Sequence, residues 1–251
     1  MNAILEVKNA TRRFGGLVAV DDVSFTVPSK GVTAVIGPNG AGKTTLFNII
    51  AGTFPPSEGA ILLGGADVTA LKPEAKAARG LVRTFQLVKL FQDLTAIENV
   101  KVGFHLKTRG GLFAALVQPA WARNAEKDVE DGAAALLDLV GLSKVAFSPA
   151  AVLPYGQQRL LEIARALAAR PQILLLDEPA AGLNAEESER LAKTIRRIAA
   201  DGTAVLLIEH DMKLVMDIAD EVVVLDYGRK IAQGSPDAVK KDPAVIAAYL
   251  G

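Results

Sequence analysis

Three stretches of the chain are almost continuously apolar. They are residues 31–37 (GVTAVIG), 172–178 (QILLLDE) and 203–209 (TAVLLIE). Strands that are buried on both faces need such runs, because helices cover both sides of a parallel sheet. The pattern therefore predicts three central parallel strands in an α/β fold.

A second group of segments alternates apolar and polar residues and contains glycine turns. These are the first thirty residues, residues 60–65 (AILLGG) and residues 221–234 (EVVVLDYGRKIAQG). Alternation with a period of two is typical of strands that bury one face only. We expect these segments to form antiparallel edge strands.

Between residues 87 and 170 the apolar residues recur mostly every three or four positions, which is the spacing of a helix. The clearest examples are residues 125–142 (AEKDVEDGAAALLDLVGL) and residues 153–166 (LPYGQQRLLEIARA). This block predicts a helical subdomain that is inserted into the sheet domain.

A helix start is also encoded farther along the chain. Asn184 is followed three residues later by Glu187. This spacing is a variant of the capping box, in which each side chain accepts a hydrogen bond from the backbone of the other residue. We expect a helix from this point to about Ala200.

The composition excludes several classes of protein and of site. With 251 residues, half of them apolar, the chain can bury a large core. Lys plus Arg and Asp plus Glu both number 28, so no net charge attracts nucleic acid, and we expect no nucleic-acid partner. The absence of Cys excludes disulfides and thiolate metal sites. Because no signal peptide and no apolar run of about 18 residues is present, we expect a soluble, intracellular chain.

The strongest chemical signal is GPNGAGKTT at residues 37–45, which fits G-x-x-x-x-G-K-[ST] between a predicted strand and an apolar helix. Its glycines let successive backbone N–H groups face phosphate oxygens at the start of a helix. Lys43 can reach the β- and γ-phosphates, and the hydroxyl of Thr44 can ligate Mg²⁺. The predicted nucleotide-binding residues are Gly37, Pro38, Asn39, Gly40, Ala41, Gly42, Lys43, Thr44 and Thr45.

Two carboxylates and a histidine follow other predicted strands. Asp177 and Glu178 end a buried strand, which is costly unless cations or water-mediated chemistry use the charges. We predict that Asp177 binds Mg²⁺, directly or through water, and that Glu178 orients or deprotonates an attacking water. His210 ends the next strand and can donate a hydrogen bond to the γ-phosphate. His105 is assigned to the polar surface.

Gln86 is a weaker candidate on its own. It follows a short apolar run in VRTFQ. Its amide can both ligate Mg²⁺ and contact the nucleophilic water. We predict that Gln86 has both roles.

The order of these features resembles that of ATP-binding cassette (ABC) ATPases over essentially the whole chain. The phosphate loop, Gln86, the helix start at residues 153–157, the pair Asp177 and Glu178, and His210 follow one another as in that family. The strings RTFQ, DEPAAGLN, LIEHDMKLVM and AAYLG are similar to those of the ATP-binding subunits of bacterial branched-chain amino acid importers.

The resemblance implies a single ABC ATPase domain of the P-loop NTPase class. A RecA-like core with a mixed sheet and an antiparallel β subdomain would comprise residues 1–86 and 171–251, and a helical subdomain residues 87–170. The family resemblance also implies that Phe14 stacks on adenine. The cofactors would be ATP and Mg²⁺.

The resemblance further implies a composite active site in a head-to-tail dimer. Tyr155, Gly156 and Gln157 would contact the ATP of a second ABC ATPase subunit, which we expect to be related to this chain but different from it. The other partners would be transmembrane permease subunits, docked on residues 87–100, and indirectly a periplasmic substrate-binding protein. The subunit would lie peripherally on the cytoplasmic face of the inner membrane.

Two positions depart from the family pattern. Leu-Pro-Tyr-Gly-Gln at residues 153–157 replaces the usual Leu-Ser-Gly-Gly-Gln, and Asn184 stands where aspartate is usual. Pro154 lacks both the hydroxyl of the usual serine and a backbone N–H. We therefore expect the backbone N–H groups of Gly156 and Gln157 to face the partner's phosphate.

Two alternatives belong to other classes. A cassette ATPase for DNA repair or ribosome-associated work would carry long coiled coils or two cassettes, whereas 251 residues hold one. A P-loop kinase of small molecules would need an acceptor pocket and no signature helix. The sequence does not identify the transported substrate, for which branched-chain amino acids or related small polar molecules are expected.

Overall fold

The structure, a computed structural model, describes residues 3–84, 89–104 and 120–250, with the backbone alone for 120–125 and 250. The chain forms two compact units: residues Met1–Gln86 with Gln172–Gly251, and residues Leu87–Pro171. Gln86 and His105 lie outside the described residues.

The first unit contains a six-stranded sheet with the order β10-β9-β3-β8-β7-β6. Neighbouring strands from β9 to β6 are parallel, and β10 is antiparallel to β9. Every residue of β3, β7 and β8 is buried, which confirms the three predicted central strands. The strands are β3 (Val32–Ile36), β6 (Leu81–Arg83), β7 (Ile173–Asp177), β8 (Ala204–Ile208), β9 (Glu221–Asp226) and β10 (Arg229–Gly234).

The prediction of antiparallel edge strands in residues 221–234 is wrong for β9. This strand pairs in parallel with β3, and Val222, Val223, Val224 and Leu225 are completely buried. A strand covered on both faces is continuously apolar, and four such residues in a row carry that signal. Only β10 forms the antiparallel edge.

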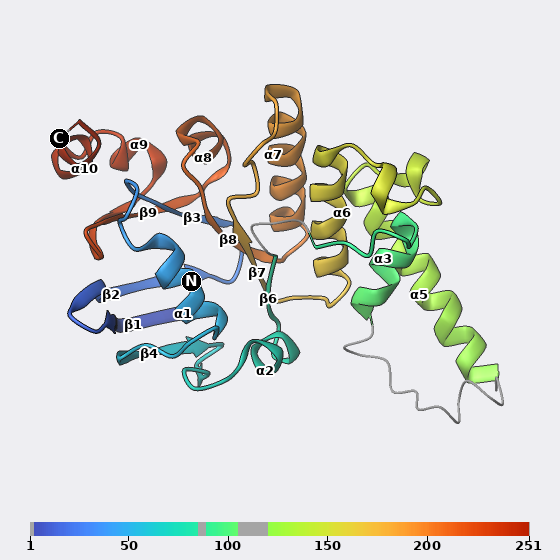
Figure 1. Cartoon of the computed structure of the whole chain (residues 1–251), viewed down its shortest axis with the longest axis horizontal. Helices are drawn as coiled ribbons and strands as arrows, with labels where there is room; N and C mark the ends of the chain where they lie inside the picture. Colours follow the sequence, from blue (N-terminus) through green and yellow to red (C-terminus); the bar gives the residue numbers. More distant parts are fainter. Residues whose placement is uncertain (1–2, 85–88, 105–119, 251) are drawn as a thin grey trace. The chain divides into compact units, whose positions relative to one another are not determined.

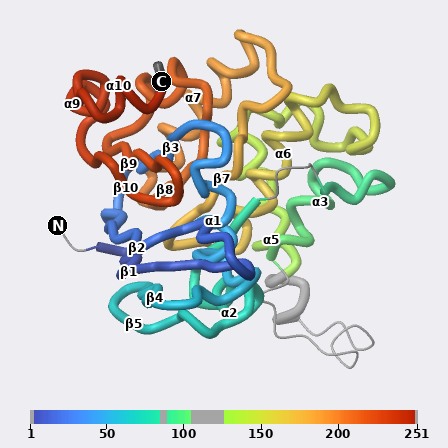
Figure 2. The backbone as a smooth tube through the Cα atoms, turned by 60° about the vertical axis from the view of Figure 1, so that its left-hand side comes forward, coloured from blue at the N-terminus to red at the C-terminus, as the bar shows by residue number. Residues whose placement is uncertain are grey.

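A second sheet of the same unit is wholly antiparallel and has the order β2-β1-β4-β5 (Figures 1 and 2). Its strands are β1 (Ala3–Phe14), β2 (Leu17–Pro28), β4 (Glu58–Leu63) and β5 (Ala66–Asp67). The antiparallel pairing predicted for the first thirty residues and for residues 60–65 is confirmed. The expected edge position is wrong for β1, which lies between β2 and β4, and for β4, because β5 pairs beyond it.

Helix α1 (Lys43–Ala51) lies between the two sheets, and this position sets the place of the phosphate loop that precedes it. Its apolar residues join one core with side chains of β1, β2 and β4 on one side and of β3, β7, β8 and β9 on the other. The completely buried residues of α1 are Leu46, Phe47, Ile49 and Ile50.

The C-terminal end of α1 is capped by a buried lysine. Lys76, on α2 (Pro73–Ala78), is completely buried and its ammonium donates to the carbonyl oxygens of Ile49 (3.3 Å) and Ile50 (2.9 Å). A cation suits the negative end of the helix dipole. Burial still lowers the pKa of Lys76 to about 8, although nearby Asp67 opposes that shift.

Helix α7 (Ala185–Ala200) packs on β3 and β8 and begins with the predicted capping box. Asn184 Oδ1 accepts the Glu187 N–H at 3.0 Å, and Glu187 Oε2 accepts the Asn184 N–H at 3.0 Å. The predicted start and end of this helix are confirmed. Three further helices follow: α8 (Met212–Ile218), α9 (Pro236–Val239) and α10 (Pro243–Leu250).

The second unit is helical, as predicted for this block. Its helices α3 (Ala96–Gly103), α5 (Ala120–Leu139) and α6 (Tyr155–Leu167) pack against one another (Figure 1). Two short 3-10 turns connect them, η2 (Ser143–Val145) and η3 (Ala150–Val152). On α6, Arg159 and Glu162 form a buried ion pair at 3.0 Å. Among the described residues, no helix is long and apolar enough to cross a membrane.

Candidate functional site

The phosphate loop is shaped by two glycines that no other residue can replace without a clash. Gly37 and Gly42 have φ of 152° and 94°. A Cβ at Gly37 would lie 2.1 Å from the carbonyl oxygen of Leu225, and one at Gly42 would lie 2.3 Å from that of Ala19. The loop therefore packs backbone against backbone, which places the start of α1 beside β2 and the end of β9.

Lys43, the first residue of α1, closes the loop from inside. Its ammonium donates to the carbonyl oxygens of Gly37 (2.7 Å) and Pro38 (2.9 Å). Burial lowers the pKa of Lys43, and the negative charge of Glu178 opposes that shift. An ammonium has three protons, so two of them hold the loop and one remains for a phosphate oxygen.

The loop opens into a cavity of about 430 Å³. Among the residues predicted to bind nucleotide, those from Asn39 to Thr45 line it, and Glu178 lines it as well. A cavity that joins a glycine-rich loop, a lysine and a carboxylate suits a phosphate chain. Its remaining lining residues, none of them predicted, are Leu17, Val18, Ala19, Tyr227 and Gly228.

Glu178 leaves the end of β7 in a strained conformation. Its φ is +45°, in the left-handed region where a non-glycine residue costs of order 1–3 kcal/mol. Its N–H is still bonded to the carbonyl oxygen of Ile208, at the end of β8, at 3.1 Å. The turn thus directs the side chain of Glu178 into the phosphate cavity, where it is only partly exposed.

Asp177, the last residue of β7, is almost completely buried. Its Oδ2 accepts a hydrogen bond from Nη2 of Arg83, on β6, at 2.5 Å, and Nη1 of Arg83 donates to Asn48 Oδ1 at 2.7 Å. Arg83 therefore balances the buried charge of Asp177 and ties it to α1.

The donor set around the loop suits Mg²⁺. Mg²⁺ prefers hard oxygen ligands and is usually held by one or two carboxylates together with substrate phosphates and water. Here Thr44, with its hydroxyl, is exposed and lines the cavity, and Asp177 is the last residue of β7, directly before Glu178, which lines the cavity as well. The described residues contain no cluster of three or more His, Cys, Asp or Glu side chains that would hold a metal without substrate.

His210 follows β8 and lies near two carboxylates. Its Nδ1 is 3.9 Å from Glu178 Oε2 and 4.0 Å from Glu209 Oε2. The imidazole itself is largely exposed, whereas Glu209 is completely buried. Of the three residues predicted to be catalytic, the structure describes Glu178 and His210, and it brings these two together.

The start of α6 differs in one respect from the expectation for the signature. Pro154 is the N-cap, and no side chain caps the helix there. The N–H of Gln157 donates to the carbonyl oxygen of Pro154 at 2.9 Å, so this N–H is used within the helix. Within the described part of the chain, no group accepts a hydrogen bond from the backbone N–H of Tyr155 or of Gly156. A nucleotide contact of Gln157 would have to come from its side chain.

The aromatic candidate lies outside the cavity lining. The ring of Phe14 packs edge-on against that of Phe54, with centroids 5.5 Å apart, and is 43% exposed. The guanidinium of Arg12 lies 4.8 Å from the centroid of Phe14 and 4.7 Å from that of Phe54. Stacking of Phe14 on adenine remains a prediction, as do the roles of Gln86, which the structure does not describe.

Two residues near the site were not singled out in the sequence. Arg83 lies three residues before Gln86, and an arginine within a short buried strand signals a buried acidic partner. Glu209 directly precedes His210 and ends a buried strand, which is the signal that singled out Asp177 and Glu178.

Comparisons with known proteins agree with the geometry. A family model described as ABC transporter matches residues 20–181, and one described as branched-chain amino acid ATP-binding cassette transporter matches residues 229–251. The chain is 47% identical to the high-affinity branched-chain amino acid transport ATP-binding protein BraF of Pseudomonas aeruginosa, over 99% of this chain and 98% of BraF. It is 44% identical to LivG of Escherichia coli K12, described in the same words, with the same coverage.

A solved structure also resembles the whole chain. The ADP conformation of MJ1267, an ATP-binding cassette of an ABC transporter, superposes with a TM-score of 0.86 at 32% identity and covers 100% of both chains. The findings support a transport ATPase, and not a repair cassette or a small-molecule kinase. The chain therefore belongs to the ABC transporter family, as one of its ATP-binding, ATP-hydrolysing subunits.

Proposed function

We propose that this chain is the ATP-hydrolysing subunit of a bacterial importer for branched-chain amino acids or related small polar molecules. The observation that carries the chemical part is the phosphate cavity, in which Lys43 and Glu178 share one space and interact electrostatically. The substrate class is supported by BraF and LivG and by the family model that matches the C-terminal residues. The chain would lie on the cytoplasmic face of the inner membrane, bound to permease subunits, while a periplasmic protein delivers the substrate.

In this proposal the predicted residues divide ATP binding and hydrolysis among them, and Gln86 both holds Mg²⁺ and contacts the attacking water. The backbone N–H groups of residues 37–45 and the third proton of Lys43 bind the phosphates, while Thr44, Asp177 and Gln86 hold Mg²⁺. Bound Mg²⁺ would neutralise charge that develops on the phosphate oxygens. Glu178 orients or deprotonates the attacking water, and His210 donates a hydrogen bond to the γ-phosphate. Phe14 would stack on the adenine.

The start of α6 would complete the site of a second cassette subunit, related to this chain but different from it. The N–H groups of Tyr155 and Gly156 point out of the first helical turn, where the helix dipole favours an anion. Residues 87–100 would dock the permease. In the described part of that segment, Phe91 is half-exposed and its backbone is fixed by the buried side chain of Asn99.

Transport by a reconstituted complex tests the proposal. The chain would be co-expressed with the permease and cassette subunits encoded beside its gene, and uptake of labelled leucine, isoleucine and valine would be measured in ATP-loaded proteoliposomes supplied with the periplasmic binding protein. We expect uptake that requires ATP and is lost in Lys43→Ala, because that variant loses a phosphate ligand. Uptake of a different solute with no competition from branched-chain amino acids would contradict the substrate class.

Replacing Pro154 by serine tests the departure at the signature. A serine at the N-cap can accept a hydrogen bond from the first turn of α6, which lacks such a cap, and can donate to the partner's γ-phosphate. We expect Pro154→Ser to leave hydrolysis at the partner's site unchanged or to raise it, by no more than the ~1.5–3 kcal/mol of a hydrogen bond to a charged group. The measurement pairs the variant with a partner subunit while the other site is inactivated. Loss of activity would mean that proline itself is required.

A further inference from the structure

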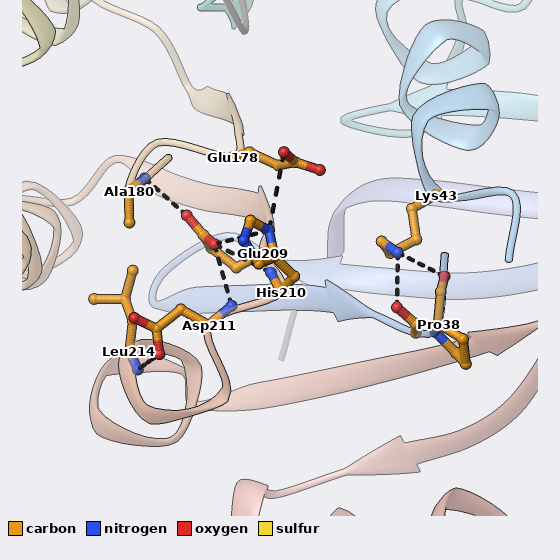
Figure 3. A network of polar contacts seen from close by, with 9 residues as sticks. Pro38, Lys43, Glu178, Ala180, Glu209, His210, Asp211 and Leu214 are labelled. Atoms are coloured by element: carbon orange, nitrogen blue, oxygen red, sulfur yellow. Dashed lines mark hydrogen bonds and ion pairs between the residues drawn. The ribbon is translucent and has the colours of Figure 1, made fainter. Parts of the chain in front are cut away.

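The buried carboxylate of Glu209 connects two loops at the carboxyl ends of β7 and β8. It follows the last residue of β8 and has an exposed fraction of 0%. Its Oε1 accepts the N–H of Ala180 at 2.8 Å, in the loop after β7. Its Oε2 accepts the N–H groups of His210 at 3.1 Å and Asp211 at 3.4 Å, in the loop after β8 (Figure 3). Each oxygen of the carboxylate thus serves a different loop.

The loop after β7 is held to the end of β8 on both sides of Glu178. The N–H of Glu178 donates to the carbonyl oxygen of Ile208. Pro179 has no N–H, so Ala180 carries the next donor along the chain, and that donor goes to Glu209. Two hydrogen bonds therefore hold the strained backbone at Glu178. One goes to the backbone of Ile208 and the other to the side chain of Glu209.

The loop after β8 is continuous with a helix. Asp211 donates its N–H to Glu209, and its own Oδ1 caps α8 by accepting the N–H of Leu214 at 3.1 Å. The peptide units on both sides of the Cα atom of His210 therefore donate their N–H groups to the same oxygen of Glu209. This holds the backbone of His210 in place. It also fixes the direction of the Cα–Cβ bond of His210, and the Nδ1 atom of its imidazole also lies 4.0 Å from Glu209 Oε2.

We propose that Glu209 is a positioning residue that makes the Glu178 loop and the His210 loop move as one unit during ATP hydrolysis. The proposal rests on the proposed roles of Glu178 and His210 at the γ-phosphate. Hydrogen bonds between backbone N–H groups and an ionised carboxylate are about twice as strong as neutral ones, and they are stronger still away from water. A shift of either loop breaks bonds to a buried charge, so the two loops keep their relative position when nucleotide binds or leaves.

Only glutamate has both the reach and the two acceptor oxygens. In Glu209→Gln the amide has the same shape, but its NH₂ group would face the N–H of one of the two loops. Aspartate keeps the charge but is shorter by one methylene. The two variants therefore separate the geometry of the carboxylate from its charge.

Hydrogen exchange of the full chain tests the link without any activity. In Glu209→Gln we expect amide exchange to become at least about ten times faster in peptides that cover residues 178–184 and 209–214, with the phosphate loop unchanged. Glu189→Gln, which removes an exposed carboxylate from α7, is the matched control and should leave all three peptides as they are. Faster exchange in only one of the two loops, or in neither, would overturn the proposal.

Steady-state hydrolysis by the reconstituted complex gives a second readout. We expect kcat of Glu209→Gln to fall at least about tenfold while the ATP concentration for half-maximal rate stays within twofold, because the phosphate loop is untouched. If Glu209→Gln does not fold, Glu209→Asp is compared in its place, and wild-type kcat in that variant would overturn the proposal, since charge without reach would then suffice. If exchange rises in both loops but Glu178→Gln remains active, the link stands and the catalytic role of Glu178 fails.

Discussion

Glu178→Gln should bind ATP as the wild-type chain does and hydrolyse it at least about a hundred times more slowly. Loss of a general base usually costs a factor of about 10²–10⁴. The substitution keeps the shape of the side chain, so the strained turn after β7 and the bond of its N–H to Ile208 should persist. Hydrolysis would be measured in the reconstituted complex, and ATP affinity with a fluorescent analogue.

Two comparisons make this result specific. Glu189→Gln removes an exposed carboxylate that pairs with Lys193 on α7 and should hydrolyse ATP normally. Lys43→Ala should weaken nucleotide binding itself, because it removes a phosphate ligand and the two bonds that close the loop. Near-normal hydrolysis by Glu178→Gln would refute its role as the residue that activates water. Equal ATP affinity in Lys43→Ala and Glu178→Gln would refute the separation of the two roles, in which Lys43 binds the phosphates and Glu178 activates water.

Gly42→Ala should abolish nucleotide binding, with an affinity loss of at least about a hundredfold, or about 3 kcal/mol. The φ of Gly42 is 94°, and the added methyl carbon would lie 2.3 Å from the carbonyl oxygen of Ala19. Backbone cannot yield as a flexible side chain does, so β2 and the start of α1 must separate. Gly42 is the N-cap of α1, where the phosphate loop passes into the helix.

Gly202→Ala is the matched control for Gly42→Ala. Gly202 has a φ of 98°, but an added Cβ meets no atom within 4 Å. We expect it to destabilise the fold by about 1–2 kcal/mol through backbone strain alone, with ATP affinity unchanged. Urea unfolding and titration with a fluorescent ATP analogue measure the two effects separately. If both variants bind ATP equally well, the close packing of the phosphate loop on β2 is not what shapes the site.

Several features near the site were readable because they depend on neighbours in the sequence. The phosphate loop needs glycines, a lysine and a threonine at fixed spacing between a buried strand and a helix. The capping box of Asn184 and Glu187 needs two residues three positions apart, and both of its hydrogen bonds are present. The runs that became β3, β7 and β8 are almost continuously apolar, as strands covered on both faces require.

The pairing of β9 shows where local pattern was insufficient. Residues 221–234 end in an alternating, glycine-containing stretch, and the whole segment was therefore expected to be an antiparallel edge. Whether a strand lies inside a sheet depends on which strands take places beside it, and β3, which adjoins β9, lies about 190 residues earlier along the chain.

The sequence by itself determined the class of fold, the phosphate loop and the ends of the strands at which Glu178 and His210 lie, because periodicity and local spacing encode these features. Tertiary structure decided which groups meet. Arg83 balances the buried charge of Asp177 across 94 positions, and Glu209 accepts the N–H of Ala180 across 29. A buried charge takes whatever partner the fold brings within reach, and no local pattern specifies that partner.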